Sequence, residues 1–342
     1  MAAESATDPL ETRFRMPNAG VHLLLVSTVL ERWRASPADA PFDPTDAAAV
    51  RGFMHGSLAP DIGYFPGGVR LFSELAHLER PADLARAMLA SAQTPEHRAY
   101  ALGWATHLLA DAAIHPLLNE AGGEYLYGDR TRPVSSTEDV ITHMRLEFGL
   151  DAAMLARFSV ADGVWCEGNV TAETIGCLVR AFQDTYGWSP AAASLLASHR
   201  FSGRLSRIAL TISRVHGATF RRRPAHRATR ALVAAASFPI LRAVRDRAGA
   251  PVLNAVMRPL PSPRWLVDAT ADAVHGVASS FEERCGTDLA ALPNVNLITG
   301  ADPGGEPDPR TREAQHQLAR LTDGRRVNGA WTAIRTSGPP SG

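Results

Sequence analysis

The 342-residue sequence contains no lysine, so all 35 of its basic side chains are arginines. It contains only three cysteines, and their spacing is neither that of a zinc ribbon nor that of a disulfide framework, which argues against thiolate metal ligation. A Gly-rich nucleotide fingerprint and a Gly-x-Ser-x-Gly nucleophile elbow are both absent. Nucleotide binding and serine hydrolase chemistry therefore have no support in the sequence.

Long hydrophobic runs are also missing. No stretch reaches the ~18 apolar residues that a membrane-spanning helix needs. Residues 1–16 mix acidic and arginine side chains, and the short apolar run at 21–26 has no small-residue cleavage site after it, so no signal peptide is evident. We expect a cytoplasmic protein, with peripheral membrane contact as an option.

Charge is balanced over the whole chain but unevenly distributed along it. The formal net charge is zero, which gives no reason to expect nucleic acid as the first-choice partner. Residues 1–199 carry 14 Arg against 24 acidic side chains, whereas residues 200–258 carry 13 Arg against one acid. This basic block could contact an anionic membrane, or it could pack against the acidic N-terminal part of the chain.

Apolar residues recur with helical periodicity, and alternating strand patterns are scarce, so we predict an all-α protein. We expect a flexible leader at 1–15, a helical domain at 16–199, a basic helical extension at 200–299, and a linker, short helix and tail at 300–342. Pro and Gly make 56–68, 122–133 and 300–310 candidate loops, the last of them disordered. The helices are predicted at 21–34, 46–55, 69–78, 82–92, 95–118, 135–158, 171–186, 190–200, 202–216, 225–247, 252–257 and 263–285.

His107, Asp111 and His115 lie at positions i, i+4 and i+8 of one predicted helix. Each step of four residues rotates by about 40°, so the three side chains share one face over about 12 Å of helix axis. That length is too great for one ion to contact both histidines. It suits two ions with the carboxylate of Asp111 between them. Because the helix is otherwise apolar, these ionisable groups need partners.

A second predicted helix repeats the pattern with His143, Glu147 and Asp151. Imidazole and carboxylate are both good zinc ligands, and two such helices packed together could enclose a multinuclear site. We interpret Asp151 as a hydrogen-bond partner rather than a ligand. Of the remaining histidines, His55 is expected to have a loop or helix-end role and His97 to be exposed.

The residues from Ala101 to Pro116, followed by His143, Glu147 and Asp151, resemble the bacterial zinc-dependent phospholipase C family, which is related to the fungal single-strand nucleases. Upstream, residues 16–22 resemble the family's N-terminal His element, and Ala59-Pro60-Asp61 resembles its Pro-Asp loop. The resemblance covers about 16–190. It implies a multi-helix bundle that uses two or three zinc ions to hydrolyse a phosphoester, with a phospholipid as the expected substrate.

The resemblance also implies roles for individual residues. One zinc would be held by His77, His107 and Asp111, and a second by His115, His143 and Glu147. His22 and the other oxygen of Asp111 would help to hold a third ion. Asp61 would be the general base or would orient the attacking water, and it is also a candidate ligand.

Two departures from the family pattern leave alternatives open. Secreted members bind the third zinc through a free N-terminal Trp, whereas 21 residues precede His22 here and none is Trp. The four-residue spacing from Asp111 to His115 is shorter than that of the secreted enzymes and matches relatives with a His-Pro step. A nuclease or phosphomonoesterase with the same metals, or a non-catalytic metal-binding scaffold, remains the alternative to a phospholipase C.

Overall fold

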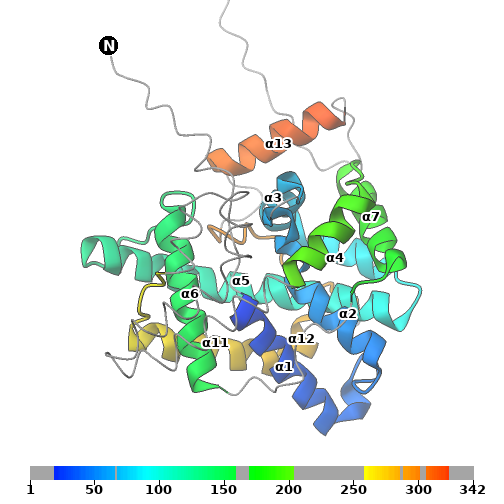
Figure 1. Ribbon diagram of the computed structural model, residues 1–342, viewed down its shortest axis with the longest axis horizontal. Coiled ribbons are helices and arrows are strands. Elements are labelled where there is room, and N and C mark those ends of the chain that lie inside the picture. The colour runs from blue at the N-terminus through cyan, green and yellow to red at the C-terminus, as the bar shows by residue number, and fades with distance from the viewer. Residues whose placement is uncertain are drawn as a thin grey trace, which may run out of the picture.

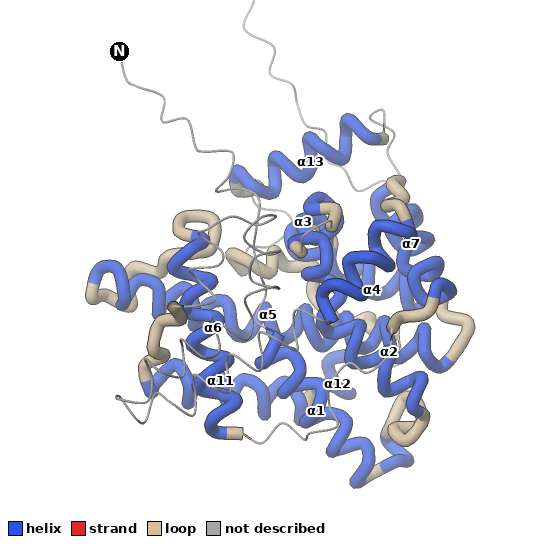
Figure 2. Tube along the Cα trace, viewed as in Figure 1, coloured by secondary structure: helices blue, strands red, loops and turns tan. Residues whose placement is uncertain are grey.

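The computed structural model describes residues 19–65, 68–158, 169–203, 258–285, 288–300 and 306–322. Within these ranges the regular structure is entirely helical, and no strand occurs (Figure 2). The predicted all-α class is therefore confirmed. Most of the basic block lies outside the described residues, as do most of the helix predicted at 202–216 and all of those predicted at 225–247 and 252–257. None of the described helices is long and apolar enough to cross a membrane.

The helices and their bounds can be followed in Figure 1. In chain order they are α1 (Ala19–Ala35), η1 (Pro37–Asp39), α2 (Ala47–Leu58), η2 (Ala59–Tyr64), α3 (Arg70–Leu78), α4 (Pro81–Ala90), α5 (Pro95–Tyr127), α6 (Val140–Arg157), α7 (Ala172–Tyr186), an unlabelled helix at 192–203, α11 (Arg264–Ser279), α12 (Phe281–Cys285) and α13 (Pro309–Leu321).

Helix α5 forms the centre of the fold, and it contacts α1, α2, α4, α6, α7 and α11 (Figure 1). It begins as predicted, because the Thr94 side chain accepts a hydrogen bond from the His97 amide and Pro95 occupies the first turn. Such central placement requires a helix that is apolar on nearly all sides, and most of its residues up to Leu118 are buried.

The predicted end of this helix is wrong. It does not stop near Leu118 but passes through Pro116 and ends at Tyr127, where Gly128 takes a positive φ of 69°. Gly122 and Gly123 were expected to form a loop, but they lie inside the helix. Because they have no side chains, the chain at 132–134 can pack directly against the helix there. A Cβ on Gly123 would lie 2.1 Å from the Arg132 carbonyl oxygen. Close packing, and not chain reversal, explains these glycines.

The stretch at 56–68 also differs from its predicted loop. Helix α2 continues to Leu58, and the 3₁₀ helix η2 follows from Ala59 to Tyr64. Pro60 is compatible with this because it sits in the first turn, where its missing N–H has no partner to lose. Gly56 and Gly103 let α2 and α5 pack closely, since a Cβ on either would approach the other helix's backbone within 2.1 Å.

The C-terminal part packs on the same core. Helix α11 contacts α1, α5 and α6, and α13 lies beside α3 (Figure 1). The helix predicted at 263–285 is divided at Ser280 into α11 and α12. Residues 306–310 are not a disordered linker, because Asp308 caps α13 by accepting hydrogen bonds from the amides of Arg310 and Thr311.

Candidate metal centre

The fold brings together all eight candidate ligands, although they span more than 120 residues of sequence. Each is at most 8% exposed. They come from five elements: His22 from α1, Asp61 from η2, His77 from α3, His107, Asp111 and His115 from α5, and His143 and Glu147 from α6. Seven of them line one pocket, and the eighth, His107, lies directly behind it against His22 and His77.

One group of three potential ligands consists of His77, His107 and Asp111. The two Nε2 atoms are 3.2 Å apart, and they lie 3.5 and 3.2 Å from Oδ2 of Asp111. In a tetrahedral zinc site with ligands about 2.0–2.2 Å from the ion, ligand atoms are separated by about 3.3–3.6 Å. The group therefore has the dimensions of such a site.

Asp61 lies beside this group. Its Oδ1 is 3.2 Å from Nε2 of His77, and its Oδ2 is 3.7 Å from Nε2 of His107. Asp61 also forms a second possible group with His22 and His107. Its Oδ2 is buried and accepts no hydrogen bond from the residues that the structure describes. The carboxylate is thus within ligand distance while one of its oxygens lacks a hydrogen-bond donor among them.

A further group consists of His115, His143 and Glu147. Nε2 of His143 is 3.1 Å from Oε1 of Glu147, and Nε2 of His115 is 3.8 Å from the same oxygen. Among the described residues this group offers three potential ligands and borders the pocket, so an ion held by these three alone would keep a coordination position for water or substrate. Catalytic zinc sites have that composition, whereas structural sites have four protein ligands.

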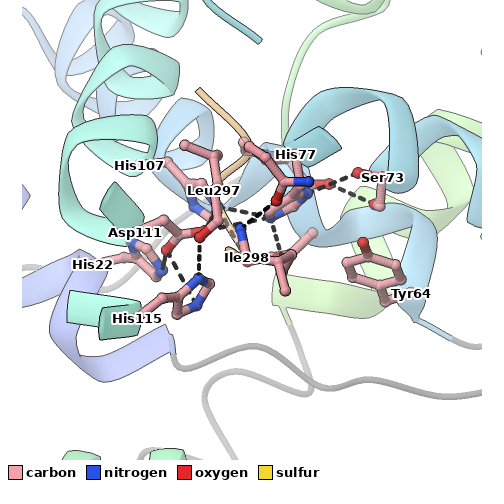
Figure 3. Close-up of polar contacts among 12 residues, drawn as sticks. His22, Tyr64, Ser73, His77, His107, Asp111, His115, Leu297 and Ile298 are labelled. Atoms are coloured by element: carbon pink, nitrogen blue, oxygen red, sulfur yellow. Dashed lines mark hydrogen bonds and ion pairs between the residues drawn. The ribbon is translucent and has the colours of Figure 1, made fainter. Parts of the chain in front are cut away.

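Asp111 connects the groups because its two oxygens face different histidines (Figure 3). Oδ2 faces His77 and His107, while Oδ1 is 3.3 Å from Nε2 of His22 and 3.8 Å from Nε2 of His115. A carboxylate in this position can bridge neighbouring ions. Its place follows from the i, i+4, i+8 spacing along α5, which puts Asp111 between the two histidines.

Backbone carbonyls fix the protonation of three imidazoles (Figure 3). Nδ1 of His77, His107 and His115 lies 2.7–2.8 Å from the carbonyl oxygens of Ser73, Ser57 and Leu297. A carbonyl can only accept, so each Nδ1 must donate its proton. In the neutral rings each Nε2 then carries a lone pair directed into the cluster. Metal-ligating histidines have this arrangement.

The 3.2 Å contact between Nε2 of His77 and Nε2 of His107 follows from this protonation. Two nitrogen lone pairs at that distance repel each other unless a cation lies between them or one ring is protonated. The contact therefore calls for a cation, either a proton on one ring or a bound ion, and the ligand spacings above fit a metal ion that accepts nitrogen and oxygen ligands.

The carboxylates of the cluster stabilise positive charge on two of its histidines, whose pKa values are raised. Burial acts to lower the pKa of His107, but the carboxylates of Asp111 and Asp61 raise it to about 9. The pKa of His77 is also raised, because Asp61 outweighs burial. The charge on His107 in turn holds the pKa of Asp111 well below its usual range despite burial. Burial and the neighbouring His107 lower the pKa of His22.

Asp151 fixes the helix that carries His22. Its two oxygens accept hydrogen bonds of 3.0 Å from the amides of Gly20 and Val21, in the first turn of α1. Burial raises the pKa of Asp151 to about 8, against the effect of these two hydrogen bonds. The side chain thus has the hydrogen-bonding role that its position on α6 predicted.

The remaining buried histidines lie apart from the cluster. His55 and His199 pack together, with ring centroids 5.9 Å apart, and Nε2 of His199 is 2.8 Å from the Tyr100 hydroxyl oxygen. His97 was expected to be exposed, but it is 5% exposed. The reason is that α7 covers the first turn of α5, where Thr174 donates a hydrogen bond to Glu96.

Four site features had no signal in the sequence patterns. Tyr64, Ile298 and Arg310 line the pocket, and the Leu297 carbonyl orients His115 from 182 residues away. Tyr64 lies in η2, three residues after Asp61, but belongs to no motif of its own. No periodic spacing connects the three C-terminal residues to the clustered histidines, and only the packing of the C-terminal part against α3 and α5 brings them to the pocket.

Comparison with known families agrees with this geometry. The sequence profile of the family described as zinc-dependent phospholipase C matches residues 21–193, half of the chain. The chain belongs to the zinc-dependent phospholipase C family. The match contains all eight clustered residues but none of the pocket residues from the C-terminal part. No curated protein and no solved structure matches the chain.

Proposed function

We propose that the protein is a zinc-dependent phosphodiester hydrolase that acts on a phospholipid in the manner of a phospholipase C. Membership of the zinc-dependent phospholipase C family supports the reaction class and the metal. The observation that carries the proposal is the pair of ligand groups joined by Asp111, one of which has three protein ligands and faces a pocket. A site for a purely structural metal would have four protein ligands.

The proposed assignment gives each group one ion. The first ion would be held by His77, His107 and Asp111, with Asp61 at ligand distance. The second would be held by His115, His143 and Glu147. A third ion would be held in part by His22 and Oδ1 of Asp111. The third position has the fewest protein ligands among the described residues. We therefore propose two firmly held ions and a weaker third.

The residues around the pocket have distinct proposed tasks. When bound, zinc ions neutralise phosphate oxygens and lower the pKa of water toward about 7. Oδ2 of Asp61 accepts no hydrogen bond, so it is available to take the proton from the attacking water. The carbonyls of Ser73, Ser57 and Leu297 hold the Nδ1 protons of three histidines, so that each ring in its neutral form directs the Nε2 lone pair toward the cluster.

Asp61→Asn tests the role of the base. Asparagine cannot accept a proton at neutral pH, and His77, His107 and Asp111 remain to hold the first ion without Asp61. We expect zinc content and melting temperature close to wild type, with hydrolysis of bis(4-nitrophenyl) phosphate reduced by about 10²–10⁴-fold, the range for loss of a general base. Zinc would be measured by plasma mass spectrometry and unfolding by calorimetry.

Glu147→Gln is the matched control, because it makes the same change of charge at a proposed ligand. It should lower both the zinc content and the melting temperature, since metal binding contributes to folding. Full activity in Asp61→Asn would show that the assignment of the base is wrong. A panel of phospholipid, single-stranded nucleic acid and phosphomonoester substrates would separate a phospholipase C from the nuclease and phosphomonoesterase alternatives.

A further inference from the structure

The pocket is completed by residues beyond the segment that matches the family. Ile298 and Arg310 line it together with the clustered histidines, and both follow residue 193 by more than 100 positions. The described residues before and after 301–305 are held by hydrogen bonds: the Leu297 amide donates to the His77 carbonyl, and the Asn296 side chain donates to Asp308 and Thr311. The position of Arg310 is therefore set by several hydrogen bonds.

Arg310 is a buried cation at the edge of the pocket. The residue is 7% exposed, although it lies in the first turn of α13, on the outside of the bundle. Its Nε is 2.6 Å from Oε2 of Glu74, and its Nη2 donates a 2.8 Å hydrogen bond to the Tyr64 hydroxyl. Tyr64 lines the same pocket. The guanidinium is thus fixed in orientation on two sides.

The third nitrogen of this guanidinium has no partner. Nη1 of Arg310 is buried and makes no hydrogen bond within the described part of the protein. A buried donor without an acceptor is costly, most of all when it belongs to a charged group. In enzyme sites such donors are commonly completed by a ligand, and arginine N–H groups match the geometry of phosphate oxygens.

The charge around Arg310 also favours an anion. Oε1 of Glu74 is 2.9 Å from Nε of Arg70, while its Oε2 is 2.6 Å from Nε of Arg310. One carboxylate is therefore shared by two arginines, and the three side chains carry a net charge of +1. Arg310, which lines the pocket, therefore does not have the Glu74 carboxylate to itself.

Resting on the proposed function, we propose that Arg310 binds a non-bridging oxygen of the substrate phosphate through Nη1. The C-terminal part of the chain then supplies a substrate-binding residue to a site whose candidate metal ligands all lie in the matched segment. The competing explanation is that Arg310 only ties α13 to α3 through its ion pair with Glu74.

Binding of inorganic phosphate to the zinc-loaded protein, measured by titration calorimetry, separates the two explanations. Arg310→Gln removes the cation, and we expect phosphate affinity to fall by about 10–100-fold, the range for a hydrogen bond to a charged group. Glu74→Gln breaks the same ion pair but keeps the cation. It should leave phosphate affinity at or above the wild-type level. Zinc content and melting temperature would be measured for each variant.

A double variant protects the test against misfolding. Arg310→Met combined with Glu74→Gln removes both members of the buried ion pair, so neither is left unpaired. The phosphate affinity of this double variant should be lower than that of Glu74→Gln by the same factor by which Arg310→Gln falls below wild type. If Arg310→Gln and Glu74→Gln weaken phosphate binding equally, the proposal is overturned, and Arg310 serves only to connect α13 to α3 through its ion pair. Unchanged phosphate affinity in the Arg310 variants, or no phosphate binding by wild type, would overturn it as well.

The outcome is separable from that of the proposed function. If wild type hydrolyses bis(4-nitrophenyl) phosphate while Arg310→Gln binds phosphate normally, the hydrolase remains and the assignment of Arg310 fails. If wild type binds phosphate through Arg310 but hydrolyses no phosphoester, Arg310 remains an anion-binding residue and the proposed hydrolase fails.

Discussion

At the scale of single residues, the centre depends on side chains whose surroundings restrict them to one orientation. Asp111 directs its two oxygens toward different histidines, and three histidines are each fixed by a backbone carbonyl. Because every one of these groups is buried, a wrong orientation would leave polar atoms unsatisfied. The same contacts that stabilise the fold therefore prepare the cluster for metal.

The helical spacing of His107, Asp111 and His115 was sufficient to predict a shared face, and the structure places them on one. Asp61 and His22 could be found only through the family resemblance, because neither has a partner at helical spacing. Arg310 could not be predicted at all. Its partner Tyr64 is 246 residues away, and an arginine in the first turn of a polar helix is ordinarily exposed.

Gly20→Ala tests the contact between α1 and Asp151. A Cβ at this position would lie 2.4 Å from Oδ1 of Asp151, so the carboxylate or the helix must move. Overpacking of this kind costs typically 1–3 kcal/mol. We expect a lower melting temperature in calorimetry and weaker zinc binding at the position of His22. Gly276→Ala is the control, because a Cβ there meets nothing within 4 Å and should stabilise α11 slightly.

At the scale of elements, helix starts were easier to predict than helix ends. Thr94 and Thr171 each cap a helix at its predicted start, and such caps are visible in a few residues of sequence. The start predicted at 135 is wrong, because Asp139 is the cap and α6 begins at Val140. The extension of α5 to Tyr127 depends instead on the chain at 132–134 packing against Gly122 and Gly123. That contact is tertiary, so local patterns could not reveal it.

Asp83 joins α4 to the chain that leads to Leu297, and it should make stability depend on acid. Partial burial acts to raise its pKa, but hydrogen bonds from Asn294 and two arginines lower it from 3.8 to about 2. Because the folded pKa is lowered, the ionised form stabilises the fold. This contribution is complete above about pH 4 and is lost as the pH falls toward 2.

The free energy of unfolding, measured in urea at several pH values, checks this prediction. Asp83→Asn should be less stable than wild type above pH 4, and the difference should vanish near pH 2. Glu31→Gln, at an exposed position of α1, controls for the change of charge. A difference that stays constant between pH 5 and 2 would show that ionisation of Asp83 contributes nothing.

At the scale of the whole molecule, the described C-terminal residues belong to the same core as the matched segment, and they reach the pocket.

The basic block at 200–258 keeps its two interpretations, since most of it lies outside the described residues. If it contacts an anionic membrane, binding to phosphatidylglycerol vesicles should weaken steeply with salt, because each Arg near the surface contributes about 1 kcal/mol of screened attraction. Sedimentation with vesicles at low and high salt measures this. Absent or salt-insensitive binding would favour intramolecular packing.

The central claim is that the clustered residues hold zinc and that the zinc-loaded pocket hydrolyses a phosphodiester. Its most direct test is a chelation and reconstitution experiment on the purified protein, in which metal content and hydrolysis of bis(4-nitrophenyl) phosphate are followed together. We predict at least two zinc ions per chain, loss of hydrolysis and a lower melting temperature after chelation, and recovery of both when zinc is returned. Hydrolysis that persists in zinc-free protein, or two bound zinc ions without hydrolysis of any phosphoester, would contradict the claim.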